Sequence, residues 1–77
     1  MVVKLDRLPA GRSGVVLRFE GGHGLLRKLD SMGLRAGKKV RMLSSQFMAG
    51  PITVLMDHRQ IAMGRGIAQR ILVETED

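Results

Sequence analysis

The sequence of 77 residues contains no cysteine, tryptophan or tyrosine and only two phenylalanines. Without cysteine there is no disulfide and no thiolate metal site, which is typical of a protein of a reducing compartment. The scarcity of aromatic rings counts against single-stranded nucleic-acid binding, because such proteins usually stack bases on aromatic side chains. No apolar run approaches the roughly 18–20 residues of a membrane span, and no basic-then-apolar signal sequence opens the chain. We therefore expect one cytoplasmic domain over residues 1–77.

Acidic residues are also few. The chain has 13 Lys and Arg against 7 Asp and Glu, which gives a formal net charge of +6. Three of the seven acidic residues lie within positions 74–77, so the rest of the chain is more basic than the total indicates. A basic surface is typical of a protein that meets nucleic acid, an anionic membrane face or an acidic protein. It is equally consistent with a surface that charge merely keeps solvated.

A short helix is predicted from about Gly24 by apolar residues at the spacing of one helical face. These residues are Leu25, Leu26, Leu29 and Met32. Gly33 then follows as a C-terminal cap in the left-handed region, with Leu34 placed to contact Leu29. We single out Leu29 and Gly33 as structural residues. A helix of about nine residues does not persist alone in water, so it must lie on the rest of the chain.

Alternation of apolar and polar residues predicts about five short strands. They cover approximately residues 15–20, 39–44, 52–57, 61–63 and 71–73. In the first of them, Val15, Leu17 and Phe19 are predicted to face the core. Five strands with one helix inserted after the first predict a mainly β fold. We expect a small β-barrel whose closure hides the strand edges and whose open end the helix covers.

Two tight turns are predicted between these elements. Residues 35–38 are predicted to form a type II turn in which Gly37 supplies the positive φ, so Gly37 is a third structural residue. Residues 57–60 are predicted to form a hairpin turn that lacks glycine, so that Asp57 or His58 takes any left-handed position.

The sequence gives little indication of catalysis or of a metal site. No Ser or Cys lies beside an obvious base and the acidic residues are scattered, so we predict neither an enzyme nor a cofactor. The candidate metal ligands are His23, which could meet Glu20 across a glycine loop, and the adjacent Asp57 and His58. Oxygen and imidazole ligands suit Fe²⁺ or Mn²⁺, but each pair falls short of a full coordination shell. The alternative is that all are ordinary polar loop residues.

A partner-binding surface is predicted on the strand over residues 39–44 and the turn before it. Its charged end consists of Arg35, Lys38, Lys39 and Arg41. Phe47 and Met48, in a polar loop at the other end about 20 Å away by the rise of a strand, form its apolar end. On this hypothesis charge guides encounter and the apolar pair resists dissociation. Alternatively, Phe47 and Met48 fold over the barrel end.

Several ordered segments resemble the ferrous iron transport protein A (FeoA) family. They read L-x-x-L-P-A-G-x-x-G-x-V from Leu5, G-L-L-R-K-L-x-x-M-G-L-x-x-G from Gly24, G-P-I-x-V from Gly50, and A-x-x-I-L-V from Ala68. Each segment is weakly specific alone, but the ordered set spans nearly the whole chain.

The resemblance implies an SH3-like β-barrel with an inserted helix. It also implies a small cytoplasmic accessory protein of ferrous iron uptake, whose partner is FeoB, a membrane-bound transporter with a cytoplasmic GTPase domain. No catalytic residues are implied. A related barrel forms the C-terminal domain of metal-dependent repressors. Two alternatives to this function remain. One is a nucleic-acid-binding barrel, which the basic residues suggest, and the other is a metal-sensing domain related to that of the repressors.

Overall fold

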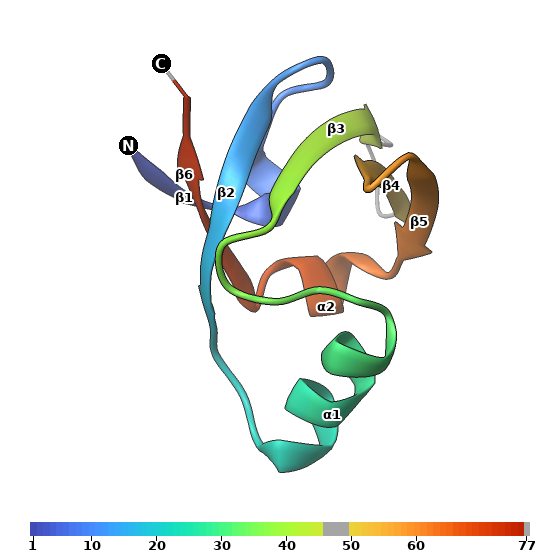
Figure 1. The fold of residues 1–77 in the computed structure, drawn as a ribbon. Helices are drawn as coiled ribbons and strands as arrows, with labels where there is room; N and C mark the ends of the chain where they lie inside the picture. Colours follow the sequence, from blue (N-terminus) through green and yellow to red (C-terminus); the bar gives the residue numbers. More distant parts are fainter. Residues whose placement is uncertain (46–49, 77) are drawn as a thin grey trace.

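The structure is a computed structural model that describes residues 1–45 and 50–76, and it is mainly β (Figure 1). Its elements, in chain order, are β1 (Val2–Lys4), the 3₁₀ turn η1 (Leu5–Arg7), β2 (Ser13–Phe19), α1 (His23–Ser31), β3 (Lys39–Ser45), β4 (Ile52–Met56), β5 (Arg59–Met63), α2 (Arg65–Ala68) and β6 (Ile71–Thr75). No helix within these two ranges is both long and apolar enough to cross a membrane.

The six strands form one antiparallel sheet in the order β1-β6-β2-β3-β4-β5. The sheet curves strongly, so that the β1–β6 pair and the β4–β5 pair lie on opposite sides of the molecule (Figure 1). The predicted fold class, a mainly β small barrel, is confirmed. Complete closure is not observed, because the described parts of β1 and β5 are the two edges of the sheet and do not pair with each other.

The number of strands differs from the prediction, because β1 was missed. It has only three residues, too few to show an alternating pattern, and it is identified by its pairing with β6, from Val2 opposite Glu74 to Lys4 opposite Leu72. The longer helix α1 consequently follows the second strand and not the first. A second, one-turn helix, α2, precedes β6.

The inner face of β2 also differs from the prediction. Val16 is 1% exposed, whereas Leu17, predicted to face the core with Val15 and Phe19, is 39% exposed. The cause is a bulge: β2 pairs with β6 in one register up to Val16 and in another from Arg18. A bulge adds one residue to one strand and thereby shifts the in–out alternation by one position. Phe19, beyond the bulge, packs against the core again.

The inner faces of β3 and β4 agree with the predicted alternation, and they supply much of the core. The inward residues, each at most 1% exposed, are Val40, Met42, Ile52, Val54 and Met56. α1 adds Leu29, which is fully buried, while its neighbours Leu25 and Met32 are half-buried against the same core. Together with α2, α1 covers one end of the curved sheet (Figure 1). The predicted position of the helix is therefore confirmed.

Gly33 ends α1 as predicted, with a φ of +85°. The Leu34 N–H donates to the Leu29 carbonyl at 3.0 Å, and the Gly33 N–H donates to the Asp30 carbonyl at 2.9 Å. This pair of bonds is the Schellman motif, and the apolar residues that accompany it, Leu29 and Leu34, are both buried. The Arg59 guanidinium also donates to the Met32 carbonyl, at 3.4 Å, and so links β5 to the helix end.

Gly33→Ala should destabilise the protein by more than about 1 kcal/mol, because the left-handed region is costly for a residue with a Cβ. That Cβ would also lie 2.9 Å from Arg59 Nη2 and displace it. Urea unfolding measures the change. The matched control is Gly24→Ala in the first turn of the same helix, where a Cβ meets nothing within 4 Å. This control should be neutral or stabilising, and equal stability of the two variants would show that the cap does not depend on glycine.

Candidate partner-binding surface

Backbone hydrogen bonds hold the basic turn before β3 against β2. The Gly37 N–H donates to the Val16 carbonyl at 2.7 Å, and the Val16 N–H donates to the Lys38 carbonyl at 2.8 Å. The turn itself is closed by the Lys38 N–H and the Arg35 carbonyl, 3.1 Å apart, and Gly37 has a φ of +93°. The predicted turn is confirmed. Its backbone presents Arg35 and Lys38 from a fixed position.

Three of the four predicted cations are paired with an acidic side chain. The ion pairs are Arg35–Asp30 at 3.0 Å, Lys38–Asp57 at 2.6 Å and Lys39–Glu76 at 3.0 Å. Five of the six side chains are about half exposed or more and Lys38 is 38% exposed, so each pair adds little to stability. Their effect is on recognition: the surface carries mixed charge, and an acidic partner has to compete with carboxylates already in place.

Arg41 is the fourth predicted cation, and it lies in the middle of β3 on the outer face of the sheet. It is exposed, and no ion pair is recorded for it with any residue of 1–45 or 50–76. Across the sheet it lies opposite Ser13 of β2 and Leu55 of β4. Phe47 and Met48, the predicted apolar end, fall outside the described residues. Their role in the surface stays a prediction.

A shallow hollow of about 340 Å³ lies on the outer face where β3 and β4 meet the β4–β5 turn. Its lining residues are Ser13, Lys39, Val40, Arg41, Leu55, Asp57 and His58. We call it the β3–β4 hollow. The hollow brings two predicted docking residues, Lys39 and Arg41, together with two candidate metal ligands, Asp57 and His58. From the sequence these two groups were predicted as separate sites. The link is the ion pair of Lys38 with Asp57, 19 positions apart in the chain.

Leu55, the half-buried apolar residue of this hollow, was not among the predicted site residues. Leu55 occupies an outward position of β4, between the inward Val54 and Met56. Alternation along the sequence placed Leu55 on the outer face, but a single outward leucine is common on protein surfaces. Only the strand register, which puts Leu55 opposite Arg41, connects it with the predicted cations.

The candidate metal ligands do not gather into one site. His23 is the first residue of α1, whereas Asp57 and His58 form the β4–β5 turn, with φ values of 51° and 64°. No group of three His, Cys, Asp or Glu that could hold a metal ion occurs within the described ranges. The hydrogen bond from Lys38 lowers the pKa of Asp57, so a cation would have to displace that lysine.

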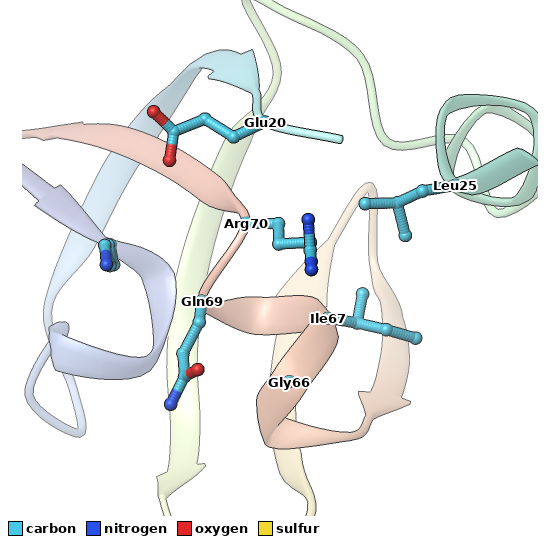
Figure 2. Close-up of a pocket in the computed structure, with 7 residues that line it drawn as sticks. Glu20, Leu25, Gly66, Ile67, Gln69 and Arg70 are labelled. Carbon is cyan, nitrogen blue, oxygen red and sulfur yellow. The ribbon is translucent and has the colours of Figure 1, made fainter. Parts of the chain in front are cut away.

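A second and larger hollow, of about 540 Å³, lies between the two helices (Figure 2). Its lining residues are Lys4, Glu20, Leu25, Gly66, Ile67, Gln69 and Arg70. Leu25 of α1 and Ile67 of α2 extend into the same space as the Arg70 side chain (Figure 2). From the sequence, Glu20 was predicted only as a possible neighbour of His23. The hollow itself was not predicted, because its walls come from segments far apart in the chain.

The carboxylate of Asp57 should titrate below its ordinary pKa of 3.8, because the Lys38 hydrogen bond favours the charged form. By linkage, the resulting stabilisation is present above the unfolded-state pKa and is lost as the pH falls through the folded-state pKa. Side-chain carboxyl NMR measures the midpoint, and Lys38→Met should raise it. The control is Lys39→Met, since Lys39 pairs with Glu76. A midpoint that does not respond to Lys38→Met would contradict this origin of the shift.

Comparison with solved structures places this fold among known ones. A crystal structure of an iron uptake regulatory protein (FeoA) matches with a TM-score of 0.92 at 37% identity, over 97% of this chain and 99% of that chain. A manganese-dependent transcriptional repressor matches with a TM-score of 0.89 at 28% identity, over 96% of this chain but only 41% of its own. The likeness to FeoA confirms the predicted SH3-like barrel.

Sequence comparison gives the same result. A candidate Fe(2+) transport protein A of Methanocaldococcus jannaschii is 34% identical over 64 residues, which is 83% of this chain and 76% of that protein. The family model described as the FeoA domain matches residues 3–75, which include every described helix and strand except the first residue of β1, Val2. The resemblance seen in the ordered motifs is thus confirmed, and the chain belongs to the FeoA family.

Proposed function

We propose that this chain is a small cytoplasmic accessory protein of ferrous iron uptake, which docks on the cytoplasmic GTPase region of a FeoB-type transporter. Membership of the FeoA family supports the link to Fe(2+) transport. The proposed role is one of binding, without a reaction catalysed by this chain. Docking could then regulate GTP hydrolysis, gating of the pore or assembly of the transporter.

The structural observation that best supports docking is the β3–β4 hollow. It combines the exposed cation Arg41, the ion-paired Lys39 and the half-buried Leu55 on one outward face. Charges at the rim of an interface accelerate encounter, while a desolvated apolar centre slows dissociation. Since Glu76 already neutralises Lys39, a carboxylate of the partner would either replace Glu76 or bind Arg41 beside it.

The docking experiment compares Arg41→Glu with the double variant Arg27→Glu, Lys28→Glu on the exposed face of α1. Arg41→Glu should slow association with the transporter's cytoplasmic domain about tenfold at low salt, and this defect should shrink as salt shortens the screening length. The α1 variant, which changes the net charge by twice as much, should bind nearly as wild type. Surface plasmon resonance at two salt concentrations measures both. Equal effects per charge would show that net charge alone matters and that the hollow is not the site.

The same measurement with RNA as the ligand tests the nucleic-acid alternative. Binding to a polyanion releases counterions, so wild-type affinity would fall steeply and linearly with the logarithm of the salt concentration. Docking on a protein through one or two charge contacts predicts a shallow salt dependence, so the slope separates the alternatives.

A metal-sensing role is the second candidate, and the repressor fold that the chain shares favours it. Its test is anaerobic calorimetry with Fe²⁺ and with Mn²⁺. If the docking proposal is right, binding to the isolated protein should be weaker than micromolar, because Asp57, one of the candidate ligands, is already held by Lys38. A stoichiometric submicromolar site that is lost in His58→Ala, and kept in His23→Ala, would instead support sensing at the β4–β5 turn.

A further inference from the structure

Among the residues that the structure describes, strand β5 is an edge of the sheet with no paired strand on one side. In the described parts of the chain it pairs only with β4, from Met56 opposite Arg59 to Ile52 opposite Met63. The register has no shift along these five residues, so β5 is a regular strand without a bulge. An edge of this kind is a template on which another strand can pair.

The β4–β5 turn determines which backbone groups are free. Positive φ at both Asp57 and His58 makes it a type I′ turn, after which the flanking residues form a hydrogen-bonded pair. Beyond the turn, hydrogen-bonded and non-hydrogen-bonded residue pairs alternate along β4 and β5. The residues of β5 in hydrogen-bonded pairs, whose N–H and C=O groups point toward β4, are therefore Arg59, Ile61 and Met63. The N–H and C=O groups of Gln60 and Ala62 consequently point away from the sheet. Both residues are exposed.

The other edge of the sheet, β1, is better protected. β1 is only three residues long and carries a lysine, and short edges and lysine are two of the devices that discourage edge pairing. β5 is longer and contains neither lysine nor proline, and its single charge, Arg59, lies at its first position. Of the two edges, β5 is therefore the one suited to accept a strand.

The side chains of β5 indicate what kind of strand would fit. Arg59 and Ile61 lie on one face of the strand, two residues apart, and Ile61 is only half-buried. Side chains directly opposite each other on paired strands interact most strongly. The Arg59 guanidinium donates to the Met32 carbonyl through Nη2 and has further N–H donors with which a carboxylate on the opposite strand could pair. An apolar residue would be complementary to Ile61, whereas the small Ala62 and the polar Gln60 on the other face require no particular partner.

We propose that the β5 edge binds an extended segment of the partner protein by strand addition, and that this segment carries a carboxylate two residues from an apolar side chain. The inference rests on the proposed function, since the partner is the transporter's cytoplasmic domain, and it specifies how the two proteins join. Main-chain hydrogen bonds to Gln60 and Ala62 supply the affinity, and Arg59 and Ile61 supply the selectivity.

A second copy of this chain is the other strand that could occupy the edge. The net charge of +6 disfavours this, because two copies repel each other. An acidic segment of another protein is attracted by the same charge.

Ala62→Pro tests the proposal directly. Proline removes the outward N–H of Ala62 but no hydrogen bond to β4, and edge strands tolerate it. Affinity for the transporter's cytoplasmic domain should fall about tenfold or more, because one donor is lost and the partner's acceptor is left without a bond. Ala62→Val at the same position keeps the N–H and should lose much less affinity than Ala62→Pro, which separates the loss of the donor from the change of side chain. Thermal unfolding of both variants checks that they are folded.

Amide hydrogen exchange of the wild-type protein tests the proposal without any substitution. In the free protein the Gln60 and Ala62 amides should exchange fast and those of Ile61 and Met63 slowly. In the complex the first two should become protected. The partner segment that becomes protected should contain the carboxylate and the apolar residue at the stated spacing, and a segment lacking them would overturn the assigned side-chain pattern.

The experiments distinguish a failure of the proposed function from a failure of strand addition. If wild type does not bind the cytoplasmic domain at all, both the proposed function and this inference are wrong. If wild type binds but Gln60 and Ala62 stay unprotected, or Ala62→Pro binds as tightly as Ala62→Val, docking stands and strand addition is overturned. If sedimentation shows a wild-type dimer that Ala62→Pro dissociates, the occupant is a second copy and the assigned partner is wrong.

Discussion

The left-handed glycine at position 33 is the constraint on which the rest of the surface depends. Because Gly33 reverses the chain at the end of α1, Leu34 returns to the core beside Leu29 and the backbone enters the turn before β3. The same reversal brings the end of α1 within reach of Arg59 on β5. The helix, the basic turn and the β4–β5 hairpin thus hold one another in place, although the helix alone is too short to persist.

Much of this arrangement was predictable from the sequence, because it is local. The cap at Gly33, the turn at Gly37 and the inner faces of β3 and β4 follow from residue type and spacing over a few positions. The in–out alternation of β2 was not predictable, because the bulge at Leu17 depends on pairing with β6. Strand β1 was missed for the same reason: three residues form a strand only because a distant strand is beside them.

The candidate surface likewise has features that the sequence predicts and features that only the fold reveals. Composition and clustering identified the cations, but not the carboxylates that pair with them, since Asp57 and Glu76 are distant in sequence from their lysines. Those pairs change the character of the surface. A strand with unpaired basic residues would attract any polyanion. Where each cation is already paired, only a partner that places its own carboxylates correctly can replace the existing ion pairs and bind. Mixed charge of this kind is consistent with the proposed contact with a protein.

The two ends of the described chain meet at the edge of the sheet opposite β5. The Met1 amine lies 3.2 Å from Glu74 Oε2, and the Thr75 N–H donates to the Met1 carbonyl at 2.8 Å. A segment that preceded Met1 would thus leave from the β1–β6 side, away from β3, β4 and β5, whereas Glu76 pairs with Lys39 and places the other end beside β3. The fold can therefore follow another domain in a larger protein while its β3–β4 hollow stays accessible. The repressor, in which this fold accounts for 41% of the chain, has the same module within a larger protein.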